Sequence, residues 1–519
     1  MATHGNDGRN ARRRFLTHSA TLVAAGAALP VLPALARTFS GEDAGPLNNI
    51  SAYPARATRV NLHGPSGAAG AADLKSAMNK MLALPPDDPR NWYRQAMIHV
   101  LDCPHGNAWF FPWHRGYLHW FERIARKLTG KATWSLPYWD WTTNPNMHST
   151  FFGANQLDTQ NPGFIHDFAT FDSKFRDPMQ KVWLRFTTAQ RQQLDLRGMT
   201  SFEVFWAAMQ VYFTRGTRRL LTAKNRQLTG AALQAVSLPS MTNALAPTDF
   251  FEFGGSMVDS HHDMTGVPGM VEDQPHNLIH DAIGGYMGDF FAATDPVFWT
   301  HHANVDRLWD VWMKRQGLRF QDGPDTWGNE PFLFFCDENG RSVESEAWDF
   351  VDRDSSNFEQ APSIPVAPSR PPNAAWPATF PGQLKSTTLP IKGSVTASFD
   401  PGKAACDAFV QNCQTAIMID LDRPVDQSAW RFGFEIQVEG SSFSAKPCGS
   451  AQFFGTMGEM PGMRHRGKLK IGIADGMRQC LEEAGAGPHR FAVTVHAEPV
   501  DNRSPTETLT VHSVTLISL

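Results

Sequence analysis

Histidines crowd one short stretch of the chain. The segment HVLDCPHGNAWFFPWHRGYLHWFE, from His99 to Glu122, holds four histidines and Cys103 among large aromatic side chains. A buried neutral imidazole needs a polar partner, so several histidines in apolar surroundings are either hydrogen-bonded one by one or share a metal ion. This stretch is therefore the first candidate for chemistry.

A second group of histidines lies much farther along the chain. In QPHNLIHDAIGG, His276 and His280 are four residues apart, so they project from one face if the segment is helical. In DPVFWTHHANVDRLW, His301 and His302 are neighbours and point about 100° apart on a helix. Only one of these two can share a site comfortably.

The candidates form two sets of three imidazoles from distant segments: His99, His105 and His114 in the first, and His276, His280 and one of His301 and His302 in the second. Two such sets predict two metals held side by side by a helical bundle. Nitrogen ligands without a carboxylate favour copper or zinc over magnesium, calcium or manganese, which prefer oxygen.

The surrounding sequence predicts a mainly α protein with a second, β-rich part. At 519 residues the chain is long enough for two domains. From about Arg59 to Phe350, apolar residues recur at three- and four-residue spacing, and Asp295 with Pro296 resembles the start of a helix. Beyond a proline-rich stretch the period changes to two, as in TAIMIDLD and RFAVTVHAE, which predicts a small antiparallel β-sandwich.

Four segments are therefore expected: an export signal (1–36), a helical-bundle domain with the two metal sites (37–360), a proline-rich linker (361–377) and a C-terminal β-sandwich (378–519). The first joins an arginine cluster, an apolar run and a cleavage site after Ala36, and Arg12-Arg13-Arg14 is similar to a twin-arginine leader. This predicts a periplasmic or secreted protein. A membrane anchor is less favoured, because Pro30 and Pro33 interrupt a short apolar run.

The net charge and the number of cysteines indicate which partners and which covalent bonds to expect. The formal net charge of −4 makes nucleic acid an unexpected partner. Six cysteines are few for a disulfide scaffold, and the sequence does not fix the pairing among Cys336, Cys406, Cys413, Cys448 and Cys480. Cys103 lies alone beside histidines, which suggests a different role.

Two of these motifs resemble a known family. HGNAWFFPWHRGYLHWFE and DPVFWTHHANVD are similar to the two signatures of the type 3 copper proteins, which are tyrosinases, catechol oxidases and haemocyanins. The matching positions are His105, His114, Arg115 and Glu122 in the first, and Asp295, Pro296, Phe298, His302 and Asp306 in the second. The resemblance covers roughly residues 58 to 350, and it is weak in the 150–255 insert and after the linker.

The resemblance implies two copper ions. The first would bind His99, His105 and His114, and the second His276, His280 and His302. His301 becomes a neighbour that is not a ligand, because the family pattern places the ligand four residues before Asp306. Cys103, in a Cys-x-His pattern, would form a thioether bond to His105, and the alternative is a free buried thiol.

Three more residues take a role from the same resemblance. Glu272 and Asn277 match the glutamate and asparagine thought to hold a water that accepts a phenol proton, which favours hydroxylation as well as oxidation. Phe290 matches a phenylalanine that overhangs the second copper. Asp281 departs from the apolar residue common in plant enzymes and leaves the substrate preference open.

The implied function is a copper-dependent phenol oxidase acting on phenolic small molecules with dioxygen. The alternatives are a catechol or aminophenol oxidase without monophenolase activity and an oxygen carrier, whereas a zinc hydrolase is disfavoured because no carboxylate joins the ligands. The sandwich is expected to cover the site as a lid, and the oligomeric state stays open. His119 is expected to be structural, and His261 and His262 to be solvated or near the site mouth.

Overall fold

The computed structural model describes residues 57–153, 156–315, 325–351, 357–359, 364, 379–406, 415–424, 430–438, 445–454, 466–473, 480–483, 490–500 and 507–518. The expected export signal (1–36) and, apart from Ile364, the expected linker (361–377) lie outside these residues. The contacts divide the chain after Tyr53, so all described residues belong to one compact unit, Pro54–Leu519.

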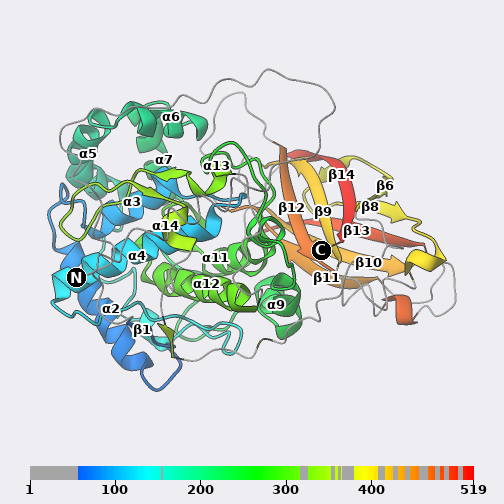
Figure 1. Cartoon of the computed structure of the whole chain (residues 1–519), viewed down its shortest axis with the longest axis horizontal. Helices are drawn as coiled ribbons and strands as arrows, with labels where there is room; N and C mark the ends of the chain where they lie inside the picture. The colour runs from blue at the N-terminus through cyan, green and yellow to red at the C-terminus, as the bar shows by residue number, and fades with distance from the viewer. Residues whose placement is uncertain are drawn as a thin grey trace, which may run out of the picture. The chain divides into compact units, whose positions relative to one another are not determined.

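Helices form the first part of this unit (Figure 1). The candidate site draws on α3 (Trp92–Asp102), α4 (Phe110–Thr129), η2 (Glu272–His276), α11 (Asn277–Ile283) and α12 (Pro296–Arg315). Around them lie α2 (Gly67–Leu82), α5 (Phe168–Leu184), α6 (Thr188–Leu196), α7 (Phe202–Thr214), α8 (Gly230–Ala235), α9 (Leu238–Ala244), α10 (Phe250–Gly254), α13 (Asp325–Gly328) and α14 (Trp348–Val351), with the turns η1 (Ser149–Phe151), η3 (Gly285–Gly288) and η4 (Ala292–Thr294) and the two-residue strands β1 (Thr58–Arg59), β2 (Pro331–Phe332), β3 (Ser345–Glu346) and β4 (Asn357–Phe358).

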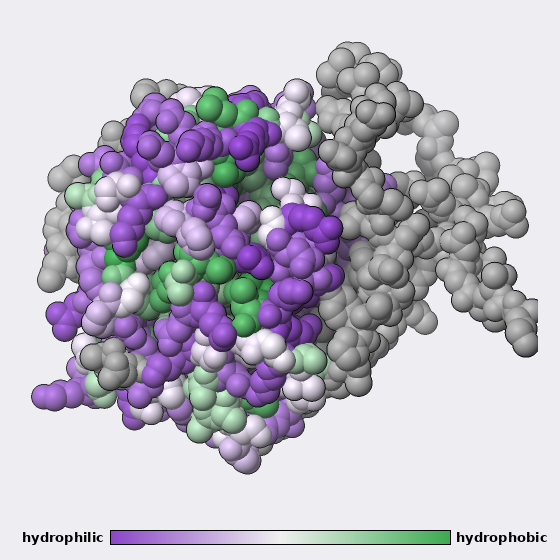
Figure 2. Space-filling model, turned by 90° about the vertical axis from the view of Figure 1, so that its left-hand side faces the viewer, coloured by the Kyte–Doolittle hydropathy of each residue, from purple (hydrophilic) through white to green (hydrophobic). Residues whose placement is uncertain are grey.

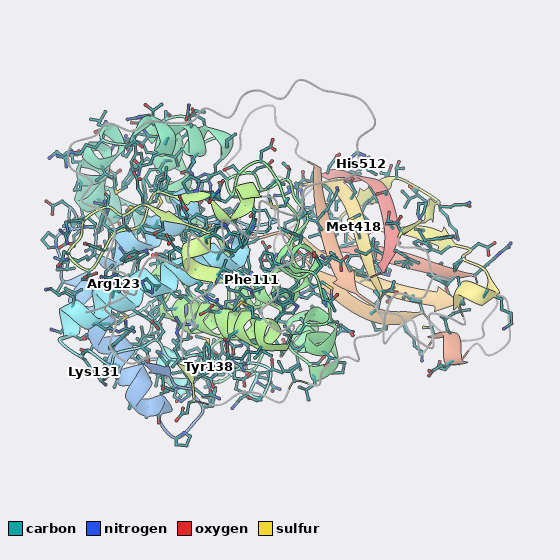
Figure 3. The ribbon with its side chains drawn as sticks, viewed as in Figure 1. Phe111, Arg123, Lys131, Tyr138, Met418 and His512 are labelled. Atoms are coloured by element: carbon teal, nitrogen blue, oxygen red, sulfur yellow. The ribbon has the colours of Figure 1, made fainter. Side chains whose placement is uncertain are left out.

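The ends of the two long central helices follow from their sequence. Asp295 caps α12 by accepting a hydrogen bond from the backbone N–H of Val297 at 3.0 Å, which confirms the predicted start with Pro296 in the first turn. The second helix, α4, ends at Gly130, whose φ of 72° suits glycine. Aromatic rings fill the space between the helices, and Phe111 of α4 stacks on Phe253 at 4.8 Å (Figure 3).

Antiparallel strands form the second part, as predicted. One sheet has the order β11 (Lys446–Ala451), β10 (Trp430–Val438), β13 (Phe491–Pro499), β8 (Ser394–Phe399), β6 (Gln383–Leu384). The other has the order β12 (Arg466–Gly472), β9 (Thr415–Asp422), β14 (Thr508–Ser518), β5 (Thr379–Pro381), with β7 (Thr388–Pro390) also paired to β14. In β10 and β13 buried and half-buried residues alternate, because one face of each strand packs on the sandwich core.

The second sheet lies between two apolar cores. In β9, Ala416 belongs to the core of the helical part, whereas its neighbour Ile417 belongs to the core of the sandwich. Successive side chains of a strand point to opposite faces, so a strand with both faces covered is buried along most of its length. The sandwich is therefore packed against the helical part in this structure.

The surface gives no sign of a membrane-spanning segment. Within the described ranges, every helix lacks either the length or the hydropathy needed to cross a bilayer. The face drawn in Figure 2 is largely hydrophilic and carries a hydrophobic patch near its centre. Apolar atoms are common on protein surfaces, so this patch alone indicates no function.

Candidate metal centre

The three histidines of the first cluster converge inside the helical part. His99 lies in the last turn of α3, His105 in the following loop and His114 in the first turns of α4. The Nε2 atoms of His99 and His114 are 3.4 Å apart, and the ring of His105 lies 5.8 and 5.6 Å from their two rings. All three side chains are buried.

The second cluster converges in the same way. His276 ends η2, His280 lies one turn later in α11, and His302 lies in α12. Nε2 of His302 is 3.3 Å from Nε2 of His276 and 3.3 Å from Nε2 of His280. These three side chains are also buried.

The two clusters face each other in the interior of the helical part. The rings of His114 and His302 stack at 4.3 Å with an interplanar angle of 10°, and those of His105 and His276 lie 5.5 Å apart. Segments far apart in the sequence thus bring six imidazoles together, as the histidine spacing predicted.

His301 lies in the second cluster as well, because one of its ring nitrogens is within 4.8 Å of those of His276, His280 and His302. Its hydrogen bonding distinguishes it from His302. Nδ1 of His301 accepts a hydrogen bond from the indole N–H of Trp141 at 3.2 Å. Its Nε2 therefore carries the proton and is not free to donate a lone pair to a metal. His302 keeps Nε2 within the converging trio, while its Nδ1 has no hydrogen-bond partner within the described residues.

Main-chain carbonyls fix the orientation of three imidazoles. Nδ1 of His99 donates to the carbonyl oxygen of Phe290 at 2.6 Å, Nδ1 of His114 to that of Phe110 at 2.7 Å, and Nδ1 of His280 to that of Met287 at 2.6 Å. A carbonyl oxygen only accepts, so each Nδ1 carries the proton. Each Nε2 then presents its lone pair to the pocket.

Side-chain oxygens fix the orientation of two more imidazoles, those of His105 and His276. Nδ1 of His105 donates to Oε1 of Glu272 at 3.1 Å, and Nδ1 of His276 lies 2.8 Å from Oδ1 of Asn277. Glu272 begins η2 and Asn277 follows its last residue, so both partners come from one short segment.

Burial keeps the six imidazoles neutral. It lowers the pKa of His99, His105, His276 and His302 well below the usual histidine range, and it lowers the pKa of His114 and of His280 to about 3. Neutral imidazoles are the form that binds metal.

The converging nitrogens fit two metal ions. At a metal–nitrogen distance of about 2.0–2.1 Å, ligands in tetrahedral geometry lie about 3.3 Å apart, close to the observed 3.3 and 3.4 Å. Lone pairs that face each other at this distance repel unless a cation lies between them. Three neutral nitrogens per ion suit copper, so the two clusters form a binuclear copper site.

Signature residues other than histidine hold the supporting helices together. Arg59 bridges Glu122 of α4, at 2.9 Å, and Asp306 of α12, at 2.7 Å, and Arg115 of α4 also contacts Asp306. These ion pairs are buried. They join the two helices that carry His114 and His302.

Glu272 lies in a buried electrostatic cluster beside the site. Its Oε1 also accepts from the backbone N–H of Gly106 at 2.7 Å, whereas its Oε2 has no hydrogen-bond partner within the described part of the chain. Burial, together with the neighbouring Asp273, raises the pKa of Glu272 well above its usual value. Glu272 is thus a buried carboxyl group that holds a proton more strongly than an exposed glutamate does.

Cys103 and Phe290 both lie beside the first cluster. Cys103 is buried two residues before His105, and burial raises the pKa of its thiol to about 12. The ring of Phe290 is 5.7 Å from that of His105 and 6.4 Å from that of His99. The resemblance implies that Phe290 overhangs the second copper; its carbonyl oxygen accepts from Nδ1 of His99 in the first cluster.

The sandwich supplies a site residue that the sequence did not indicate. Phe454, which follows β11, stacks on His105 at 4.2 Å with an angle of 25° and lies 4.7 Å from His280 and 5.3 Å from Phe290. Its ring is buried and contacts both histidine clusters. An isolated phenylalanine after a strand carries no local signal of such a role.

His261 and His262 are not solvated, which corrects the expectation from their polar loop. Both are buried and bond Oδ1 of Asp102 through Nε2 at 3.0 Å, and Nδ1 of His261 lies 2.6 Å from Glu330. Burial opposes protonation of His261, but Asp102 and Glu330 outweigh it and raise its pKa. Nδ1 of His262 accepts from Arg197 at 3.3 Å, so its Nε2 carries a proton. Hydrogen bonds thus satisfy this cluster without a metal.

Comparisons with known proteins agree with this geometry. The family model for the common central domain of tyrosinase matches residues 87–315. A (+)-larreatricin hydroxylase of Larrea tridentata is 27% identical over 449 residues, which cover 79% of this chain and 69% of that protein. A tyrosinase of Hahella sp. is 28% identical over 305 residues, covering 58% and 54%. A latent aurone synthase structure, 21% identical, matches the fold over 90% of this chain and 91% of that one with a TM-score of 0.59.

Proposed function

The chain belongs to the type 3 copper family of tyrosinases and polyphenol oxidases, and from this premise we propose that it hydroxylates monophenols at the ortho position and oxidises catechols to ortho-quinones with dioxygen. The observation that carries the proposal is the pair of neutral histidine clusters that face each other in the interior of the helical part. When bound, the copper pair supplies dioxygen activation and electron transfer.

We assign His99, His105 and His114 to the first copper and His276, His280 and His302 to the second. The converging ligand nitrogens support this assignment, as do the Nδ1 contacts of the five histidines other than His302. Replacing a ligand with alanine is expected to remove one copper.

We propose that a thioether bond joins Cys103 to His105. The bond would replace the thiol S–H and one ring C–H, with two electrons passing to dioxygen, and it would fix the imidazole ring. The buried position of Cys103 two residues before His105 supports it. The peptide holding both residues is then expected to be lighter by two hydrogen atoms, and an unmodified mass would remove the proposal.

Proton transfer from a monophenol is assigned to Glu272. Its buried Oε2, which has no hydrogen-bond partner among the described residues, can accept the phenol proton through a water, and Asn277 lies on the same segment. A raised carboxyl pKa makes Glu272 a stronger base than an exposed glutamate. The similarity to a (+)-larreatricin hydroxylase and to a tyrosinase supports hydroxylation as one of the reactions.

The sandwich is proposed to act as a lid. The ring of Phe454 lies against His105, His280 and Phe290, where a phenol ring would have to approach the metals. Substrate then enters only when this ring leaves the pocket, so the full chain is expected to be a weakly active, latent form. The fold that the chain shares with a latent aurone synthase supports the lid proposal.

Initial rates on a monophenol, a catechol and an aminophenol test the proposal. Activity on all three supports it, and a catechol or aminophenol rate without a monophenol rate favours an oxidase lacking hydroxylation. Reversible oxygen binding with no quinone formed would indicate an oxygen carrier. Export through a twin-arginine leader is also proposed, and the N-terminal sequence of the mature protein checks it.

A further inference from the structure

The site histidines differ in what holds their second nitrogen. His99, His114 and His280 donate to main-chain carbonyls, whereas His105 and His276 depend on the side chains of Glu272 and Asn277. A main-chain carbonyl presents only an acceptor. A side-chain partner needs a support of its own, because it can rotate.

The sandwich supplies that support to the segment from Glu272 to Asn277. Nε2 of Gln274 donates to the carbonyl oxygen of Ser450 at 2.6 Å, and the backbone N–H of Lys470 donates to Oδ2 of Asp273 at 2.7 Å. Lys470 also reaches the carbonyl oxygen of Glu252 through Nζ at 2.7 Å. The segment needs outside contacts because Gln274, at φ −144° and ψ 114°, interrupts its helical backbone.

One of these contacts continues to a metal ligand. Nδ2 of Asn277 donates to the carbonyl oxygen of Gln452 at 2.7 Å, and Oδ1 of the same amide faces Nδ1 of His276 at 2.8 Å. Both bonds are buried. A chain of hydrogen bonds therefore runs from the sandwich backbone through Asn277 to His276.

The direction of these hydrogen bonds, from donor to acceptor, determines the tautomer of His276. The carbonyl of Gln452 accepts only, so it holds the NH₂ end of Asn277 and turns the oxygen toward His276, which then carries its proton on Nδ1. Without Gln452, the amide can turn over with little change in shape and present NH₂ to Nδ1. The proton would then lie on Nε2, and His276 could not donate that nitrogen to copper.

We infer that the C-terminal sandwich is a positioning element of the second copper site, through Gln452, Asn277 and the tautomer of His276. The first site does not share this dependence, because the backbone N–H of Gly106 only donates, so it holds Oε1 of Glu272 as an acceptor toward Nδ1 of His105 without help from the sandwich. Displacing the sandwich therefore weakens retention of the second copper and spares the first. The inference rests on the proposed ligand assignment.

Two variants weaken the interface without touching a ligand. Gln274→Ala removes the side-chain bond from the helical part to the carbonyl oxygen of Ser450. Lys470→Met removes the side-chain bond from the sandwich to the carbonyl oxygen of Glu252. Arg431→Ala is the matched control, because Arg431 lies on the same sandwich and forms an ion pair with Glu498 at the surface. Full-length proteins loaded with copper are dialysed against a chelator, and bound copper is counted over time.

Each interface variant is combined with His114→Ala, which leaves the second site, or with His302→Ala, which leaves the first. In the His114→Ala background, each interface variant is expected to lose copper several-fold faster than His114→Ala alone. In the His302→Ala background, the interface variants are expected to lose copper at the same rate as His302→Ala alone. Adding Asn277→Asp, which offers oxygen at both ends, should restore retention in the His114→Ala series. Equal loss from both series, or no effect of either interface variant, would overturn the inference. The copper content of the unmutated chain, expected to be two ions, tests the proposed metal site separately from this inference.

Discussion

If the sandwich acts as the proposed lid, replacing Phe454 with alanine should raise the phenol oxidase activity of the chain. The ring is buried against His105 and His280, and alanine leaves that volume free while the backbone of the sandwich stays in place. The variant therefore separates the effect of the ring from the effect of the whole domain.

The expected size follows from the cost of moving the ring. Leaving the pocket re-exposes one buried phenylalanine, which costs about 1.5–3 kcal/mol. Since about 1.4 kcal/mol corresponds to a factor of ten, kcat/KM for a catechol should rise roughly tenfold to a hundredfold in Phe454→Ala.

Quinone formation followed by absorbance, at equal copper content, measures this change. Phe453→Ala is the matched control, because its ring lies in the sandwich core, 6.2 Å from that of Phe432, and not in the pocket. It removes an equal volume and should activate much less. A Phe454→Ala rate within twofold of the unmutated chain, or equal activation by both variants, would refute the reasoning.

Three further predictions concern the base, the ion cluster and pH. Glu272→Gln should lower the monophenol rate by roughly a hundredfold and the catechol rate far less, as initial rates on both substrates will show. Asp102→Asn should destabilise the fold by about 3–5 kcal/mol, whereas Asp400→Asn, in an exposed pair, should change it by less than about 1 kcal/mol in urea unfolding. The copper-free protein should lose stability as pH falls from 6.5 toward about 3, because His114 and His280 bind protons there only when unfolded. Denaturation midpoints at about pH 7 and about pH 5 check the sign.

Histidine spacing and periodicity predicted the parts of the site that are local in sequence. The motif around His114 and the Asp295 cap of α12 each depend on a few neighbouring residues, so both could be read from the chain. The change of period after the linker predicted the sandwich for the same reason, and the structure confirms it.

The missed features depend on contacts between distant segments. Phe454 reaches the pocket only because β11 docks beside η2, and Gln452 acts through a main-chain oxygen that any residue would provide. His262 lies in a polar loop that predicts exposure, yet Asp102 and Arg197 bury and satisfy it. Neither composition nor period records such pairings.

Copper content per chain tests the central claim most directly. Metal analysis of the purified full-length protein should find two copper ions, falling to one in His302→Ala and staying at two in His301→Ala, because only His302 directs a free Nε2 into the trio. Two coppers in His302→Ala, one in His301→Ala, or zinc in place of copper would contradict the account.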